Sequence, residues 1–264
     1  MMAWSGSTGP SPVPDLETFD LILVALGVLA GATLQSATGF GFALVAGPAV
    51  FAAVEPAEAI AILFALGSVL NVLILREEDR PSQVNGGQLA RVLAWSAPGI
   101  AAGILILLAL SKPALQVIVG LCVIGAVAIH AAGGRTGERG STPLAEAVAG
   151  FAAGTLTTTT GTAGPPLVLL LRSEGASREA FRDTITAMFL SLNVLGATAL
   201  LVSGESVSLP SAAAFALFVA LVILGRLAGR WVFERLDEER FRAVGLALIV
   251  VTALASITAG IAGA

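Results

Sequence analysis

The chain has 264 residues, of which 56% are hydrophobic and 12% are charged, and its mean hydropathy is +0.92. Such a composition excludes a soluble globular enzyme and indicates a protein that folds in lipid. A formal net charge of -4 argues against a nucleic-acid partner, because phosphate binding needs clustered basic residues on an exposed surface.

Apolar segments of membrane-spanning length recur along the chain, since a helix needs about 20 residues to cross the hydrocarbon core. The pattern therefore predicts an all-α polytopic membrane protein. Residues 1–18 contain no Lys or Arg and are rich in Pro, Ser and Gly, which predicts a flexible, uncleaved tail rather than a signal peptide. The eight predicted segments cover residues 19–54, 57–75, 89–110, 113–133, 144–172, 180–203, 208–228 and 241–262.

The two halves of the chain resemble each other. When the sequence is shifted by 122 residues, Gly39 aligns with Gly161 and Asn71 aligns with Asn193. Each half then contains four apolar segments. The predicted organisation is the tail (1–18), a first transmembrane repeat (19–133), a cytoplasmic linker (134–143) and a second transmembrane repeat (144–264).

The basic residues predict how the segments cross the membrane, because cytoplasmic loops carry an excess of Lys and Arg. If all eight segments cross, the 14 basic residues split nine to five between the two sides. If 19–54 and 144–172 are instead broken, re-entrant helices, the split is thirteen to one, with only Lys112 outside. Each half then crosses three times, so the repeats have opposite orientations, as in many secondary transporters. We predict this inverted arrangement, with eight plain spans as the alternative.

The first segment of each half contains a polar break: GATLQSATGFGFALVAGP at 31–48 and GTLTTTTGTAGPP at 154–166. Gly and Pro in these stretches weaken or forbid a continuous helix. Non-helical backbone at membrane depth is tolerated only inside the protein or beside a watery cavity, so we expect the breaks to face each other. A helix that resumes after a break presents free N–H groups and the positive end of its dipole, which favour an anion.

Neutral hydrogen-bonding side chains surround both breaks and can solvate an oxyanion without a fixed counter-charge. Asn71 and Asn193 are candidates both for substrate contact and for structural hydrogen bonds between helices. Gly, Ser and Thr also serve ordinary helix packing in membranes, but four consecutive Thr before Gly161 favour a binding site. The predicted substrate-binding residues are Gln35, Ser36, Thr38, Gly39, Phe40, Gly41, Asn71, Thr158, Thr159, Thr160, Gly161, Thr162, Gly164 and Asn193.

The sequence predicts no catalytic residue, no metal site and no cofactor. His130 is the only histidine and Cys122 the only cysteine, so a His/Cys metal site and an internal disulfide are both excluded. Both breaks lack Asp, Glu, His, Lys and Arg, which argues against a membrane-embedded enzyme such as a lipid pyrophosphate phosphatase. An anion channel remains the alternative to a carrier that binds its anion between the breaks, because neutral Thr-lined constrictions also conduct anions.

Taken in order, the two breaks and the stretch LGRLAGRWVFERLDEERFRAVGLALIVV at 224–251 resemble the sulfite exporter TauE/SafE family of anion transporters. The resemblance covers nearly the whole chain, from about residue 20 to residue 262. It implies a secondary transporter of sulfite, sulfonates such as sulfoacetate, or related organosulfur or carboxylate anions in the bacterial inner membrane. The expected partners are the anion and the lipid bilayer, and a homo-oligomer is left open. The positions that match the family's breaks are Gln35, Thr38, Gly39, Gly41, Thr159, Thr160, Gly161 and Gly164.

Overall fold

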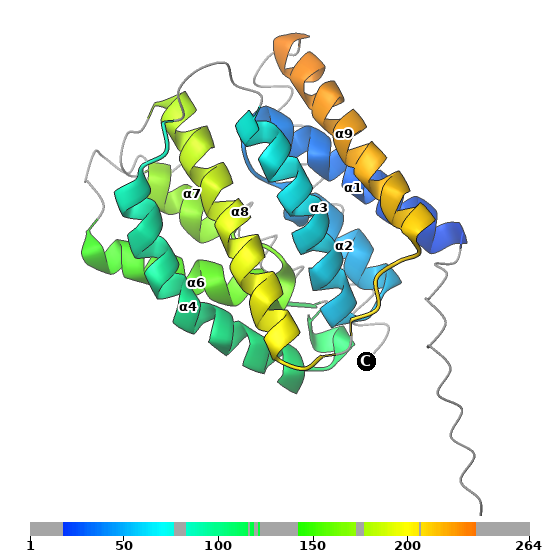
Figure 1. The fold of residues 1–264 in the computed structure, drawn as a ribbon, viewed down its shortest axis with the longest axis horizontal. Coiled ribbons are helices and arrows are strands. Elements are labelled where there is room, and N and C mark those ends of the chain that lie inside the picture. Colours follow the sequence, from blue (N-terminus) through cyan, green and yellow to red (C-terminus); the bar gives the residue numbers. More distant parts are fainter. Residues whose placement is uncertain are drawn as a thin grey trace, which may run out of the picture.

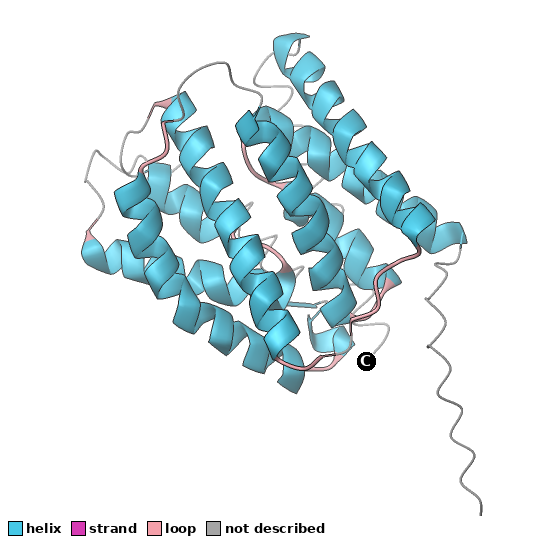
Figure 2. Ribbon diagram, in the orientation of Figure 1, coloured by secondary structure: helices cyan, strands magenta, loops and turns pink. Residues whose placement is uncertain are grey.

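The computed structural model describes residues 18–76, 83–115, 142–172, 177–205 and 207–235, together with 117, 118 and 121. Every regular element bounded in this part of the chain is a helix, which confirms the predicted all-α class (Figure 2). The predicted segment at 241–262, most of the one at 113–133, and nearly all of the tail and the linker lie outside these residues. The helices are α1 (Thr18–Thr38), α2 (Phe42–Ala53), α3 (Pro56–Arg76), α4 (Gly86–Ala109), α6 (Pro143–Thr160), α7 (Gly164–Arg172), α8 (Arg178–Val202) and α9 (Ala212–Arg235).

Three of these helices begin at side chains that cap their free N–H groups. Asn85 accepts a hydrogen bond from the third residue of α4, Thr142 does so for α6 and Ser177 for α8, each at 3.2 Å. Such N-caps satisfy one of the donors that a helix cannot satisfy internally. The starts of α4, α6 and α8 are therefore encoded locally in the sequence.

The predicted breaks are present as interruptions between consecutive helices. In the first, α1 ends at Thr38 and α2 begins at Phe42, with Gly39 at φ 86° and Gly41 at φ 114°. In the second, α6 ends at Thr160 and α7 begins at Gly164, with Gly161 at φ 70°. Positive φ is costly for residues with a side chain and free for glycine, which explains why both helices stop at glycine.

The helices form a bundle in which α3 and α8 lie side by side at the centre (Figure 1). On one flank α1 packs along α9, and on the other α4 packs along α6. In both flanking contacts a helix of the first half lies against a helix of the second. The backbones approach closely there: a Cβ on Gly225 would lie 2.6 Å from the Leu29 carbonyl oxygen, and one on Gly103 would lie 2.6 Å from that of Thr155. Glycine permits this approach because it has no side chain.

Five of the described helices are long and apolar enough to cross a membrane, namely α1, α3, α4, α8 and α9. Large hydrophobic side chains such as Phe19, Leu26 and Leu105 are exposed on their outer surfaces, at 73%, 61% and 69%. That is expected where lipid, not water, is the surrounding solvent. The chain is therefore a polytopic membrane protein.

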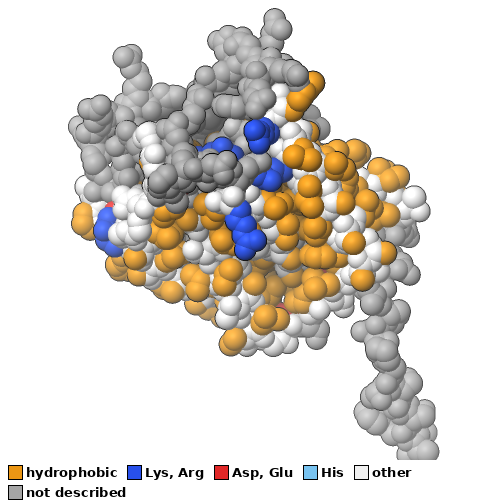
Figure 3. All heavy atoms as spheres, turned by 45° about the horizontal axis from the view of Figure 1, so that its top comes forward, with side chains coloured by type: hydrophobic (Ala, Val, Ile, Leu, Met, Phe, Trp, Pro, Cys, Tyr) orange, Lys and Arg blue, Asp and Glu red, His pale blue; other side chains and the backbone are white. Residues whose placement is uncertain are grey.

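The described basic residues are divided between the two ends of the bundle. Arg76 ends α3, whereas Glu55 directly precedes that helix and pairs with Lys112 at 3.4 Å. We call the end at which α3 finishes with Arg76 the basic end. Figure 3 shows Lys and Arg side chains gathered toward one part of the surface. The described arginine side chains of the basic end are Arg76, Arg91, Arg182, Arg226 and Arg230.

Candidate functional site

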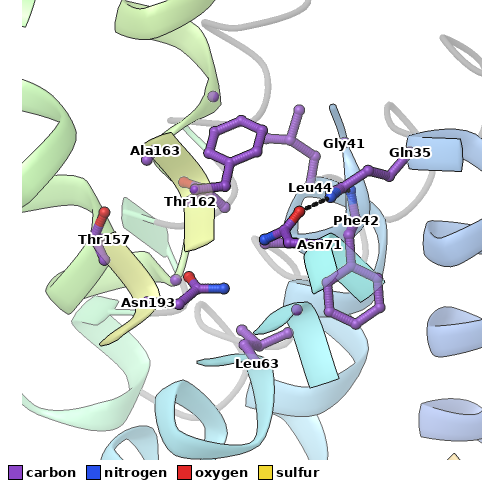
Figure 4. A pocket seen from close by; sticks show the side chains of 15 residues that line it. Gln35, Gly41, Phe42, Leu44, Leu63, Asn71, Thr157, Thr162, Ala163 and Asn193 are labelled. Carbon is purple, nitrogen blue, oxygen red and sulfur yellow. Dashed lines mark hydrogen bonds between the residues drawn. The ribbon is translucent and has the colours of Figure 1, made fainter. Parts of the chain in front are cut away.

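The two breaks meet at a cavity in the centre of the bundle, as the sequence predicts. The space that the centre of a water molecule can occupy in it is about 40 Å³. A cavity that holds one water needs roughly 10–15 Å³ of such space. The space therefore suits a few water molecules or one small polyatomic ion. It is lined by Gln35, Gly41, Phe42, Ala43, Leu44, Leu63, Gly67, Asn71, Thr157, Gly161, Thr162, Ala163, Gly164, Phe189 and Asn193 (Figure 4).

Gln35, in the last turn of α1, joins three helices at one edge of the cavity. Its Nε2 donates to Oδ1 of Asn71 on α3 at 2.7 Å, and its Oε1 accepts from the N–H of Phe42 at 3.1 Å. Gln35 and Asn71 are 4% and 1% exposed, so both hydrogen bonds are shielded from water. The network fixes the start of α2 and holds Asn71 with its Oδ1 toward Gln35 and its side-chain N–H groups on the cavity side (Figure 4).

Asn193, on α8, supplies a second side-chain amide. Figure 4 shows Asn71 and Asn193 extending from opposite sides into the same space. A Cβ placed on Gly67 of α3 would lie 2.9 Å from Nδ2 of Asn193, so the central helices approach closely at this point. Glycine at 67 therefore makes room for the Asn193 amide beside the cavity.

The two helix N-termini at the cavity offer different numbers of donors. In α2, the N–H groups of Ala43 and Leu44 belong to the first turn, which has no intrahelical acceptors, and both residues line the cavity. In α7, the corresponding turn contains Pro165 and Pro166, which have no N–H. Backbone donors for an anion are therefore concentrated at the start of α2.

The threonine hydroxyls of the second break are already engaged. Those of Thr157, Thr159 and Thr160 donate to the carbonyl oxygens four residues earlier, at 2.7, 2.8 and 2.8 Å. Oγ1 of Thr162 lies 2.7 Å from Oγ1 of Thr160. A hydroxyl has one hydrogen to donate, so the amides of Asn71 and Asn193, with the N–H groups of α2, are the principal donors for an anion.

Among the residues that the structure describes, no charged side chain lines the cavity, and no group of three or more His, Cys, Asp or Glu could hold a metal ion. A comparison with protein-family models matches residues 23–256 to the family described as sulfite exporter TauE/SafE. The chain belongs to this family. The comparisons with curated proteins and with solved structures give no match. Members of the TauE/SafE family are membrane transporters and not enzymes, which assigns the same general role to this chain.

The structure brings half of the predicted site residues of this TauE/SafE protein together at the cavity: Gln35, Gly41, Asn71, Gly161, Thr162, Gly164 and Asn193. The other half do not line it: Ser36, Thr38, Gly39, Phe40, Thr158, Thr159 and Thr160. Ser36 packs toward Gly229 of α9, and Thr158 donates to the Ile100 carbonyl of α4 at 3.2 Å. The hydroxyl of Thr38 donates within the break, at 2.6 Å to the Phe40 carbonyl.

Eight cavity residues are absent from the sequence prediction: Phe42, Ala43, Leu44, Leu63, Gly67, Thr157, Ala163 and Phe189. Most are apolar and carry no chemical signal of a site. Gly67 and Phe189, however, each lie four residues before one of the two asparagines. Residues at i and i+4 share a helix face, so this spacing could have identified both.

Two substitutions test whether the anion binds at the asparagines or at the threonines. Asn193→Leu removes a cavity amide at similar volume and should weaken anion binding at least about five-fold, because a lost buried hydrogen bond costs about 1–3 kcal/mol. Thr38→Val changes a group outside the cavity and should alter the affinity less than about two-fold. Titration of both purified proteins with the same anion measures the difference. A larger loss for Thr38→Val would move the site to the first break itself.

Proposed function

We propose that this chain is a secondary transporter of small anions, of the sulfite, sulfonate or related organosulfur or carboxylate class. The observation that carries the proposal is the cavity between the two breaks, whose described lining residues carry no charge and include the start of α2, Asn71 and Asn193. The family described as sulfite exporters supports the substrate class. The bacterial inner membrane is the proposed location.

The chemistry of the cavity favours an oxyanion. The N-termini of α2 and α7 both lie at it, and the positive end of a helix dipole stabilises a negative charge. Uncharged amide donors bind oxygen atoms without forming an ion pair. Such binding is readily reversible, which suits a carrier that must release its substrate on the other side.

An inverted repeat would provide the alternating access that a carrier needs. The 122-residue shift that aligns the breaks also relates α1 to α6 and α4 to α9. The contact of α1 with α9 is then the counterpart of the contact of α6 with α4, as a two-fold exchange of halves requires. We propose that the first hairpin enters from the end of Lys112 and the second from the basic end, which faces the cytoplasm.

A thermal-shift and binding screen of the purified protein tests the substrate class. The screen contains sulfite, sulfate, thiosulfate, sulfoacetate, taurine and small carboxylates. We expect saturable stabilisation by at least one sulfur oxyanion or sulfonate. In proteoliposomes that anion should show saturable counterflow, which a carrier performs and an open channel does not. Saturable counterflow of a carboxylate alone would reassign the substrate, and conduction without counterflow would favour a channel.

Labelling of single cysteines tests the topology. In a Cys122→Ser background, cysteines replacing the exposed Thr18 and Glu55 flank the first hairpin. A re-entrant hairpin predicts that an impermeant maleimide labels both from the same side, and that it labels a cysteine at Gln83 from the other side. Labelling of positions 18 and 55 from opposite sides would instead show that residues 19–54 cross the membrane once.

A further inference from the structure

One face of α8 leads from the basic end to the cavity. Arg182, Thr186, Phe189 and Asn193 are spaced by four, three and four residues, so they lie along one face of the helix. Phe189 and Asn193 line the cavity. Arg182 lies in the second turn of α8 and is partly buried, and its Cγ would be 3.4 Å from a Cβ placed on Gly39. The arginine side chain therefore lies against the first break.

Thr186 lies between Arg182 and the cavity and has an unusual hydroxyl. The residue is 0% exposed, and its Oγ1 has no hydrogen-bond partner among the described residues. By contrast, Thr157 and Thr198 donate to the carbonyl four residues earlier, at 2.7 and 2.8 Å. A buried hydroxyl that leaves this local acceptor unused is available to a ligand or to a water molecule.

The corresponding face of α3 does not carry these polar groups. The 122-residue shift that pairs Asn71 with Asn193 pairs Ile60 with Arg182 and Phe64 with Thr186. Ile60 and Phe64 are 0% and 2% exposed and belong to the hydrophobic core. In the first half, apolar residues fill these positions. Packing alone therefore does not explain why the second half has an arginine and a threonine there.

We propose that this face of α8 is the path along which the anion moves between the basic end and the cavity, a refinement that rests on the proposed function. Arg182 attracts the anion, since a guanidinium binds oxyanions with parallel N–H groups. Thr186 donates to it at an intermediate position. Phe189 lines the cavity whereas Thr186 and Arg182 do not, so Phe189 marks the cavity end of the path.

Cysteine modification tests the path without requiring transport. In a Cys122→Ser background, Thr186→Cys should react from the basic end at least ten-fold faster with an anionic methanethiosulfonate than with a cationic one. The preference should fall several-fold in Arg182→Gln, persist in Arg182→Lys and weaken as salt is added. Ile185→Cys is the matched control, because Ile185 is equally buried but packs in an apolar cluster, and it should not react.

The outcomes separate the path from the proposed function. No reaction at position 186 from the basic end, or a preference that neither Arg182→Gln nor salt changes, overturns the path even if the protein binds sulfur oxyanions. The expected labelling supports the path as an anion route even if the substrate screen selects another anion. If Arg182→Gln does not fold, the salt dependence of the protein that retains Arg182 decides in its place.

Discussion

Replacing Gln35 by Glu is expected to abolish anion binding while the fold is retained. The two side chains have nearly the same shape, and a carboxylate can still accept the N–H of Phe42, as Oε1 of Gln35 does at 3.1 Å. Asn71 can rotate its amide to donate to the new carboxylate instead of accepting. The substitution therefore adds a negative charge to a cavity in which the described lining residues carry none.

The size of the effect follows from Coulomb repulsion. Two like charges about 4 Å apart repel by roughly 4 kcal/mol at an effective dielectric constant of about 20, which corresponds to nearly a thousand-fold loss of affinity. Binding should be measured at alkaline pH, which favours the ionised carboxylate, with the anion that stabilises the wild-type protein. The exposed Gln83 offers the same change of charge away from the cavity, and Gln83→Glu should bind within about two-fold of wild type.

Gln35→Leu provides the complementary variant. It adds no charge but leaves the N–H of Phe42 and Oδ1 of Asn71 without their present partner, at a cost of about 1–3 kcal/mol for each buried group. We expect lower thermal stability for Gln35→Leu at every pH, and for Gln35→Glu a stability that falls as alkaline pH ionises the buried carboxyl group. If Gln35→Glu binds the anion within three-fold of wild type, the cavity between the breaks is not the binding site.

Gly103→Leu is expected to cause a large loss of folded protein, because α4 and α6 pack too closely at this residue to admit a side chain. A Cβ on Gly103 would lie 2.0 Å from Oγ1 of Thr158 and 2.6 Å from the carbonyl oxygen of Thr155. The second atom belongs to the backbone of α6 and cannot rotate away. Overpacking of this kind costs about 1–3 kcal/mol or more, and the helices would have to separate to accommodate the side chain.

Thermal denaturation of the purified variants in detergent tests this prediction. The expected decrease in Tm for Gly103→Leu is about 2–12 °C, since the cost is about 1–3 kcal/mol and about 1 kcal/mol shifts Tm by roughly 2–4 °C in a domain of this size. Gly86→Ala is the control, because no atom lies within 4 Å of a Cβ there, and its Tm should be unchanged or slightly higher. Adding Thr158→Ala to Gly103→Ala should not restore stability, since the Thr155 carbonyl remains. Full restoration would show that the hydroxyl, and not the backbone, limits the approach.

The general class of this protein and the location of its breaks could be predicted from the sequence. Long apolar segments require helices in lipid, because each backbone polar group must be satisfied within its own segment. Glycine at 39, 41 and 161 predicts the breaks for an equally local reason, since glycine adopts the positive φ that interrupts a run of helix. The family match covers residues 23–256, which include both breaks. Local chemistry decides these features, so neighbouring residues are sufficient to predict them.

The tertiary structure decided which polar groups line the cavity. Thr157, Thr158, Thr159 and Thr160 are equivalent in the sequence, but successive residues of a helix point about 100° apart. Only Thr157 of the four lines the cavity, whereas Thr158 donates to α4 across a glycine contact. The packing of α6 on α4 fixes the rotation of α6 about its own axis. The amino-acid composition of the helix does not predict that rotation. Sequence alone therefore placed the two breaks to within a helix turn, and only the packing of the helices decided which of their polar side chains reach the cavity.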